Sequence, residues 1–470
     1  MIDRYSYRRF SRLVVIAATA QLAGCINLIP AYQRPATPVA AAYPPGLPTG
    51  DRSGTAAADI EWQRYFADPK LLRLIDLALL NNRDLRVAIL NIELARATYQ
   101  VKRADELPTL GVGGSAQRQT FNRALVNTFS IGFQVTSYEL DFFGRVRSLS
   151  QSALAQYLAT EEARKTTQIA LVAALANAYV NALADDALLR VTEETVATRE
   201  ESLRLTRLRF DNGAASALDF RQAEQLLESA RATLAQTQRQ RLLDDNAIAL
   251  LVGQELPGDL PPSLPLAAQQ SVVDLPAGLP SDLLIRRPDV LAAEQQLLAA
   301  NANIGAARAA FFPRIALTAA SGTASTALSS LFNAGTFAVT GTATLFQPIF
   351  DAGRNRANLE VAKVNRDIAV TQYERTIQTA FREVADSLAG RATLGEQLRA
   401  QTAQTTAARI AFELADLRYR NGASSFLEVL DAQRTLFAAQ QSAVQVQALQ
   451  VQNLITLYKV LGGGWTELPP

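Results

Sequence analysis

The feature that most constrains this chain is the stretch from Arg145 to Asp211, which contains neither glycine nor proline. At 1.5 Å per residue, one helix over this stretch would be roughly 100 Å long, far longer than helices in ordinary globular domains. A second stretch of equal length, Arg354 to Arg420, is interrupted only by Gly390 and Gly395, where we expect irregular helix. Both stretches are rich in Ala, Leu, Gln, Arg and Glu, which predicts two long helices packed as in a coiled coil.

The sequence also repeats itself, so the long helices belong to two similar halves. Asp84 aligns with Asp289, 205 positions later, whereas Asn212 aligns with Asn421, 209 positions later. The four additional residues of the second half fall within residues 313–353. Because insertions are accommodated in surface loops, we expect a loop in that interval.

Each half contains a pair of β-strands ahead of its long helix. Residues 129–140 and 337–346 alternate apolar and polar side chains with period two, as strands with one apolar face do. The preceding strands are expected to begin after Pro108 and Pro313. Each strand has about ten residues, the length of a membrane-crossing β-strand. The sequence therefore predicts four strands per chain.

Each long helix ends at an Asn-Gly pair, after which a second helix is expected to return alongside the first. Glycine suits the left-handed backbone conformation just past a helix C-terminus. Ser216 with Asp219, and Ser425 with Glu428, are spaced as capping boxes for the returning helices. The two hairpin tips are defined by Asn212, Gly213, Ser216, Asn421, Gly422 and Ser425.

Residues 1–24 have the composition of a secretory signal peptide, with four arginines, an apolar core and small residues at the end. Cys25 closes the sequence "LAGC", which resembles the lipobox of bacterial lipoproteins, so we predict that Cys25 is lipidated. Residue 26 is Ile rather than the Asp that can retain lipoproteins at the inner membrane, which favours the outer membrane of a Gram-negative bacterium. Residues 25–60 are rich in proline and are expected to form an extended tether.

The rest of the chain divides into a first repeat, 61–253, a proline-rich linker, 254–281, and a second repeat with the C-terminal segment, 282–470. Each repeat is predicted to contain a helix, two strands, a long helix and a helical hairpin.

The composition argues against an enzyme. The chain has no histidine, one cysteine, and 46 basic against 44 acidic residues, for a net charge of +2. Zinc sites and activated nucleophiles rely on His and Cys, and a balanced charge gives no reason to expect nucleic-acid binding. The acidic doublets Asp185-Asp186 and Asp244-Asp245 are expected to be solvated helix surface. The composition leaves open only a carboxylate site for Mg²⁺ or for glycoside chemistry, and we predict no catalytic, metal or cofactor site.

Four strands per chain imply an oligomer. A membrane offers no water to an open sheet edge, so strands that span it must close into a barrel. About eight strands is the lower limit for closure, so several chains have to contribute to one barrel. Three chains would give twelve strands, but these patterns alone do not choose three chains over four.

Several segments closely resemble the TolC-type outer-membrane factors, and most of all the lipoprotein branch (NodT-like) that partners resistance–nodulation–division (RND) pumps. The resemblance covers nearly the whole mature chain, in order. It is carried by "WQRYFADPKLLRLIDLALLNNRDLRVA", "DFFGRVR", "RRPDVLAAEQQLLAANANIGAARAAFFPRI", "YRNGASSFLEVLDAQR" and "YKVLGGGW".

The resemblance implies a mixed α and β membrane protein. Three identical chains would form a 12-stranded β-barrel continuous with a periplasmic α-helical barrel. It also implies an efflux channel for small molecules such as drugs, fed by an inner-membrane RND-type pump through a periplasmic adaptor. Three alternatives remain: a type I protein-secretion duct of the same fold, a coiled-coil structural lipoprotein, and a periplasmic adaptor. The two helical hairpins argue against the adaptor, which carries one, and the alternating strands argue against the structural lipoprotein.

The two hairpins differ in one pair of charges. Asp431 and Arg434 are three residues apart and share a helix face, whereas their first-half counterparts are Gln222 and Gln225. From the residues alone, a surface ion pair explains them. The resemblance implies instead a ring of three Asp431 carboxylates that closes the periplasmic end of the channel, while the hairpin tips dock the adaptor and pump. The gate residues implied by the resemblance are Tyr419, Arg420, Leu427, Asp431 and Arg434.

Overall fold

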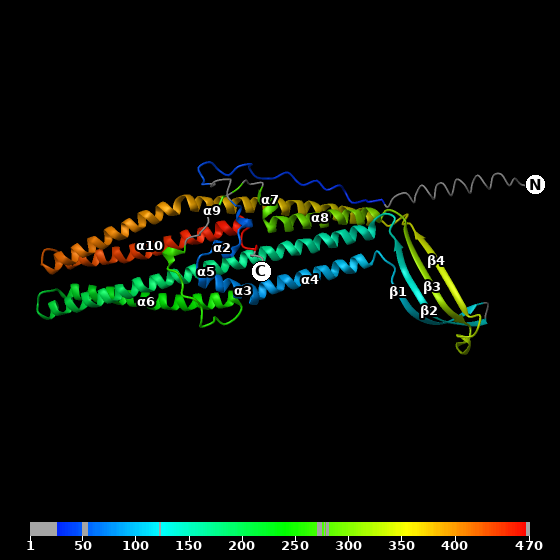
Figure 1. Cartoon of the computed structure of the whole chain (residues 1–470), viewed down its shortest axis with the longest axis horizontal. Helices are drawn as coiled ribbons and strands as arrows, with labels where there is room; N and C mark the ends of the chain where they lie inside the picture. The colour runs from blue at the N-terminus through cyan, green and yellow to red at the C-terminus, as the bar shows by residue number, and fades with distance from the viewer. Residues whose placement is uncertain are drawn as a thin grey trace, which may run out of the picture. The chain divides into compact units, whose positions relative to one another are not determined.

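The computed structural model describes residues 26–48, 55–121, 124–269, 275–276, 278 and 282–466. The predicted signal peptide and the predicted lipidation site Cys25 lie outside the described residues. The fold combines long helices with one four-stranded antiparallel sheet (Figure 1). In chain order the helices and strands are α2 (Trp62–Tyr65), α3 (Pro69–Asn81), α4 (Arg83–Ala104), β1 (Leu110–Phe121), β2 (Ala124–Leu140), α5 (Arg145–Asp211), α6 (Ala217–Val252), α7 (Leu283–Arg286), α8 (Pro288–Ala309), β3 (Arg314–Ser325), β4 (Phe337–Phe346), α9 (Arg354–Arg420) and α10 (Phe426–Val460).

The two long helices, α5 and α9, each span 67 residues without a break, as predicted. The irregular helix predicted at Gly390 and Gly395 is wrong, because α9 runs through both glycines. A Cβ on Gly390 would lie 2.2 Å from Nδ2 of Asn453 on α10. The glycine therefore leaves room for the side chain of Asn453, and the helix continues despite a propensity penalty of about 1 kcal/mol.

The four strands pair in chain order, so β1 and β4 form the edges of the sheet. β2 is longer than predicted, because it begins at Ala124 and pairs there with Phe121. β3 and β4 are joined by residues 326–336, which include the 3-10 turn Leu328–Ser330. The loop expected from the offset between the halves is present there.

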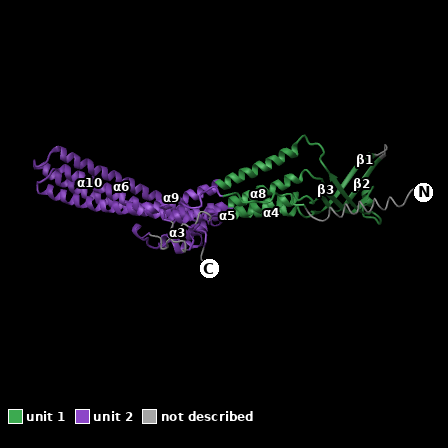
Figure 2. Ribbon diagram, turned by 90° about the horizontal axis from the view of Figure 1, so that it is seen from above, with its two compact units in different colours: residues 1–36, 91–161, 292–374 green, residues 37–90, 162–291, 375–470 purple. Residues whose placement is uncertain are grey.

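Two compact units cut across the two sequence halves (Figure 2). One unit comprises residues 1–36, 91–161 and 292–374, and includes the sheet. The other comprises residues 37–90, 162–291 and 375–470, and includes both hairpin ends. Each unit takes segments from both halves, so neither half forms a compact unit alone.

In each half, an equivalent hydrogen bond joins the start of one helix to the end of another. Asn82, just before α4, donates through Nδ2 to the backbone carbonyl of Leu251 near the end of α6, at 2.8 Å. Arg287, just before α8, donates through Nη1 to the carbonyl of Val460 at the end of α10, at 3.0 Å. Both contacts give a partner to a carbonyl in the last helical turn, where the helix itself offers none.

A glycine with positive φ follows each of these helix ends. Gly253 has a φ of +81° and Gly462 a φ of +88°, a conformation that favours glycine. A Cβ at Gly253 would lie 2.5 Å from the carbonyl oxygen of Asn81, and one at Gly462 would lie 2.7 Å from that of Arg286. The two halves therefore share a backbone arrangement that admits no side chain at this position.

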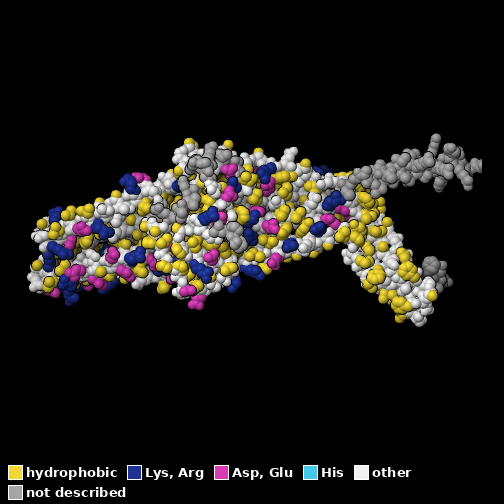
Figure 3. Space-filling view, viewed as in Figure 1, with side chains coloured by type: hydrophobic (Ala, Val, Ile, Leu, Met, Phe, Trp, Pro, Cys, Tyr) yellow, Lys and Arg dark blue, Asp and Glu magenta, His cyan; other side chains and the backbone are white. Residues whose placement is uncertain are grey.

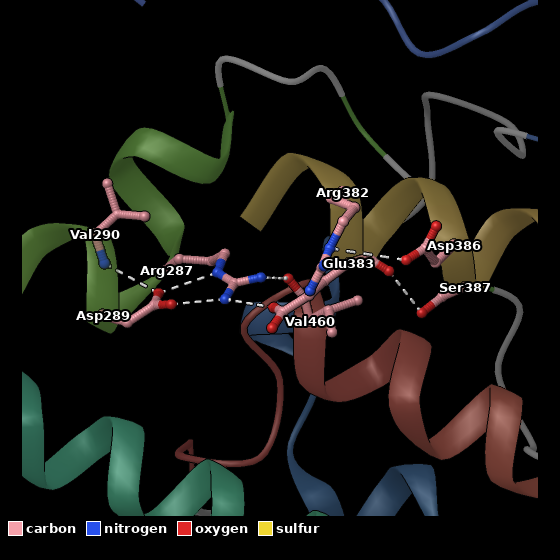
Figure 4. Close-up of polar contacts among 8 residues, drawn as sticks. All are labelled: Arg287, Asp289, Val290, Arg382, Glu383, Asp386, Ser387 and Val460. Carbon is pink, nitrogen blue, oxygen red and sulfur yellow. Dashed lines mark hydrogen bonds and ion pairs between the residues drawn. The ribbon is translucent and has the colours of Figure 1, made fainter. Parts of the chain in front are cut away.

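In the second half this contact is built on a buried cation (Figure 4). Arg287 is only 8% exposed. Its Nη2 donates to Asp289 at 2.6 Å and to Glu383 of α9 at 2.9 Å, while Nη1 reaches Val460. The guanidinium thereby joins α8, α9 and α10, and the two carboxylates compensate the charge that burial would otherwise destabilise.

The first described residues run in an extended conformation along α8 and are held there by side chains. Asn301 of α8 donates to the carbonyl of Pro30 at 2.8 Å. Tyr32 donates to the buried carboxylate of Glu294 at 2.9 Å, and Arg34 donates to both oxygens of the same carboxylate at 2.6 and 2.8 Å. Glu294 is thus the main anchor for this segment.

The expectation that both acidic doublets are solvated helix surface is wrong for one residue of each, because the doublets face each other across α5 and α6. Arg241 pairs with Asp186 at 2.7 Å and with Asp245 at 2.6 Å. Asp244 is 7% exposed and shares a hydrogen bond with Asp185. Burial, this hydrogen bond and the charge of Asp244 raise the pKa of Asp185 to about 7.

Removing the guanidinium of Arg287 should destabilise the protein. Arg287→Met leaves two carboxylates without their cation, and we expect a loss of about 3 kcal/mol. Arg286→Met is the matched control, because Arg286 pairs with Asp59 at the surface, where such a pair contributes less than about 1 kcal/mol. Thermal unfolding of the purified protein in detergent measures both, and equal midpoints for the two variants would contradict the role of Arg287.

The carboxyl pair should make stability depend on pH. Asp185 holds its proton in the folded state up to about pH 7 but in the unfolded state only up to about pH 4. Its contribution to stability is therefore present below about pH 4 and is lost as the pH rises to about 7. Unfolding midpoints measured across this range should fall for the wild type and change less for Asp185→Asn. Asp186→Asn should keep most of the wild-type slope, and parallel curves for the wild type and Asp185→Asn would refute the shared proton.

Candidate functional site

The two hairpin tips have the same backbone geometry. Gly213 and Gly422 both have a φ of +72°. The N–H of Ala214 donates to the carbonyl of Arg209 at 2.7 Å, and the N–H of Ala423 donates to that of Arg418 at 2.8 Å. The left-handed glycines predicted at both helix ends are confirmed, and they let each chain reverse within one turn. The tip residues named from the sequence are all exposed: Asn212, Gly213, Ser216, Asn421, Gly422 and Ser425.

The helix caps that follow the tips differ. Ser216 and Asp219 form the predicted capping box, in which each side chain bonds the other residue's backbone N–H. The capping box predicted at Ser425 is wrong, because its side chain makes no cap hydrogen bond. The longer side chain of Glu428 reaches the guanidinium of Arg418 at 3.6 Å instead. The first tip is therefore locked by its own cap, whereas in the second the capping carboxylate reaches back to the preceding helix.

The predicted gate residues lie at this second tip. Asp431 and Arg434 are exposed on α10, and Leu427 is 58% exposed on the preceding turn. In the part of the chain that the structure describes, no ion pair joins Asp431 to Arg434, while Arg420 pairs with Asp416 one turn earlier on α9, at 2.7 Å. Both charged groups of α10 thus stand on the outside of the single chain.

Tyr419, the remaining residue of the predicted gate, is half-buried between the two hairpins. The guanidinium of Arg209 lies 4.5 Å from the centre of its ring, and the ring of Phe426 lies 5.1 Å away. Arg209 also donates to the carbonyl of Arg420 at 3.4 Å. These contacts join the end of α5 to the end of α9. A cluster of buried side chains packs the hairpins together beside them: Ala223, Leu226, Phe426, Val429 and Leu430.

The sheet separates into an apolar and a polar face, because residues paired across strands share a face. The apolar face carries large exposed side chains that include Val112, Ile131, Phe133, Phe337, Val339 and Leu345. Most of the opposite face carries small or uncharged side chains that include Gln134, Thr318, Ala320, Thr340, Thr342 and Thr344. At one end of this face, Glu139 and Arg314 form an ion pair at 2.6 Å. The predicted period-two pattern is confirmed for residues 337–346 and for residues 129–136, but not for residues 137–140. Charged side chains gather over the helices rather than over the visible side of the sheet (Figure 3).

β2 contains a β-bulge, which keeps the apolar side chains before and after it on the same face of the sheet. Val135 pairs with Ala319 and Tyr138 with Leu317, so two residues of β2 stand opposite one residue of β3. Ser137, inside the bulge, has a φ of 54°. Without the additional residue, Tyr138 would turn to the polar face. The bulge shifts the alternation of apolar and polar side chains by one residue beyond residue 136. The sequence pattern did not reveal this shift.

The structure resembles solved outer membrane channels. The open state of the outer membrane channel MtrE from Neisseria gonorrhoeae matches with a TM-score of 0.86 and 40% identity, over 93% of this chain and 98% of that chain. A membrane protein from Pseudomonas aeruginosa also matches with a TM-score of 0.86, at 41% identity over 93% of this chain and 100% of that chain. The fold is therefore that of an outer membrane channel.

Sequence comparison gives the family. The model described as "Outer membrane efflux protein" matches residues 74–254 and 279–463. The toluene efflux pump outer membrane protein TtgC of Pseudomonas putida is 48% identical over 471 residues, which cover 97% of this chain and 96% of that protein. The outer membrane protein OprJ of Pseudomonas aeruginosa is 43% identical over 454 residues, 94% of each chain. The chain belongs to the outer membrane efflux protein family.

Proposed function

We propose that this protein is the outer-membrane channel of a tripartite efflux system. It passively conducts small molecules, drugs among them, that an inner-membrane RND-type pump delivers through a periplasmic adaptor. Conduction of this kind needs no catalytic group and no cofactor. Relatives named for the efflux of toluene, solvents and antibiotics support a cargo of small molecules.

The open four-stranded sheet carries this proposal. Its apolar face is exposed, and its edges, β1 and β4, have no further strand beside them in the described chain. In lipid, the backbone groups of an open edge would lack hydrogen-bond partners. Further copies of the chain supply those partners, and three copies close a barrel of twelve strands whose apolar side faces lipid. The polar face, which carries Gln134 and Thr340, then lines the channel.

Two attachments complete the assembly that we propose. A lipid on Cys25 anchors the mature chain in the outer membrane, supported by the "LAGC" sequence. The exposed tips around Gly213 and Gly422 dock the adaptor and the pump at the periplasmic end. Their identical turns give the adaptor six similar contact points in a trimer.

The five residues named at the second tip form the periplasmic gate. Asp431 and Arg434 are exposed and unpaired with each other within the described chain, which leaves both for neighbouring subunits. Three Asp431 carboxylates around one axis would make a ring. Ion pairs between these carboxylates and basic groups of neighbouring subunits would close the channel, and the ring would favour cations at the entrance. Release of these pairs lets the second hairpins swing outward. The same helix position holds neutral Gln222 in the first hairpin, so folding alone does not require a charge there.

Single-channel recording in planar bilayers tests the channel and its gate together. We expect small, mostly closed events from the wild type and several-fold larger or longer openings from Asp431→Ala. The substitution removes the carboxylates, and with them the ion pairs that close the channel. Gln222→Ala, the counterpart in the first hairpin, is the matched control and should behave as the wild type. Equal conductance in all three proteins would refute the gate and keep the channel. Silence from all three, in protein that remains folded, would refute the channel.

The intact mass of the purified mature protein tests the anchor. Cleavage before Cys25 with addition of acyl chains is the expected result. A mass that shows an unmodified cysteine would contradict the lipid anchor while leaving the channel unaffected.

A further inference from the structure

The joint at which the sheet meets the long helices occurs once within the chain, and closure of a barrel creates it a second time between copies. We propose that Arg354, at the start of α9, forms an ion pair across this second joint with Asp105 and Glu106 of the next copy. We call these two residues the acidic loop. The inference rests on the proposed barrel, because the second joint exists only between copies.

The joint within the chain brings the end of β2 and the start of α5 against the start of β3. The carboxylate of Glu139 accepts from Nε and Nη2 of Arg145 at 2.7 and 2.8 Å, and it pairs with Arg314 at 2.6 Å. Beside this contact, the rings of Phe143 and Phe312 stack with their centres 4.6 Å apart. One carboxylate on the β2 side therefore compensates two arginines, one from each half of the sequence.

The repeat places an equivalent joint between copies. β1 and β4 are the edges of the sheet (Figure 1), so closure of a barrel puts β4 of one copy beside β1 of the next. Residues around the start of α9 repeat those around the start of α5 at an offset of 209, and residues between α4 and β1 match those between α8 and β3 at an offset of 205. β4 and the next β1 therefore meet as β2 and β3 meet within the chain.

The arginine of this second joint has no carboxylate of its own. Arg354 is the counterpart of Arg145, but the counterpart of Glu139 is Pro348. Arg354 is exposed, and within the described chain no ion pair joins it to a carboxylate. The nearby Asp351 instead accepts from backbone N–H groups at the start of α9. A cation that is compensated in the first half is thus left without a partner in the second.

The missing carboxylates are present on the facing side of the joint. Asp105 and Glu106 stand at the positions that Ala310 and Phe311 occupy in the second half. Both are exposed, and in the described part of the chain neither forms an ion pair. The hydroxyl group of Tyr138 donates to the carbonyl of Glu106 at 3.0 Å, which fixes the backbone of the acidic loop at the end of the sheet. The charge compensation found within the chain at the first joint is therefore divided between two copies at the second.

Apolar side chains on both sides of the second joint support the same contact. Ile349 and Phe350, between β4 and α9, are 91% and 89% exposed, and Leu110 at the start of β1 is 67% exposed. Ile349 and Leu110 are the counterparts of Leu140 and Ile315, which pair across β2 and β3. A sheet that continues from one copy to the next gives these side chains a cross-strand neighbour.

The ion pair also determines which edges meet. Backbone hydrogen bonds alone would let any exposed edge pair with any other. In copies inserted in the same direction, two β4 edges would bring together two Arg354 side chains, and two β1 edges would bring together two acidic loops. Both arrangements place like charges side by side, which disfavours them. Only β4 against β1 pairs opposite charges, and this head-to-tail order is the one that closes a ring.

Charge reversal in the purified protein tests the pair. We expect Arg354→Glu to lower, by several degrees, the temperature at which the trimer dissociates in detergent, because like charges then meet at the joint. Asp105→Arg with Glu106→Arg should lower it as well. The triple variant should recover most of the wild-type value, because opposite charges meet again. Native mass spectrometry after heating measures the trimer, and far-UV circular dichroism shows that each variant keeps its helices.

Glu93 provides the matched control, because it is an exposed acid on α4 that lies about 18 Å before the acidic loop. Arg354→Glu combined with Glu93→Arg should dissociate as readily as Arg354→Glu alone. Wild-type dissociation in every variant, no recovery in the triple variant, or equal recovery from Glu93→Arg would each overturn the ion pair. A wild-type protein that forms no trimer would overturn the proposed channel instead.

Discussion

The backbone of an open strand edge must find hydrogen-bond partners, and in lipid no water can supply them. A sheet of four strands leaves two such edges, and this constraint determines most of the architecture that surrounds it. It requires several copies of the chain and, in the proposed barrel, turns the apolar face of the sheet to lipid and the polar face to the channel. The β-bulge at Ser137 serves this arrangement, because it keeps Tyr138 on the apolar face of the sheet.

Duplication supplies the number of strands, and divergence between the copies supplies the proposed moving part. The equivalent contact between helix ends is made by neutral Asn82 in the first half and by a buried, doubly paired Arg287 in the second. The same tip is capped by its own side chains in the first half and left uncapped in the second. The pseudo-repeat keeps the backbone geometry equal while its side chains differ, which is consistent with the proposed gate, in which the first hairpin holds its position and the second moves.

Most of the fold was predictable because it rests on long, regular patterns. Helices without Gly or Pro, strands with period two, and Asn-Gly helix ends are local signals, and the bounds of α5, α9 and β4 follow from them. What failed depends on partners remote in sequence. Gly390 looked like a helix irregularity because Asn453 was not visible as its neighbour, and Glu428 looked like a cap because Arg418 was not visible as a competitor.

Polar residues, too, were predictable from the sequence only in part. The exposed charges of the second tip stand out against neutral residues in the first half, so comparison of the halves found them. The doublets at Asp185 and Asp244 gave no such signal, because burial of a polar residue is decided by the helix that packs against it.

The docking of the N-terminal segment on α8 bears on how the channel reaches the membrane. Glu294 holds Tyr32 and Arg34, and the N–H of Ile26 donates to the carbonyl of Phe142, two residues beyond the end of β2. A lipid attached to the residue before Ile26 would therefore deliver β2 to the bilayer surface as soon as the segment docks. Confinement to a surface raises the effective concentration of chains that must meet, so the anchor would act as an assembly aid that turns a search in the periplasmic volume into one in two dimensions.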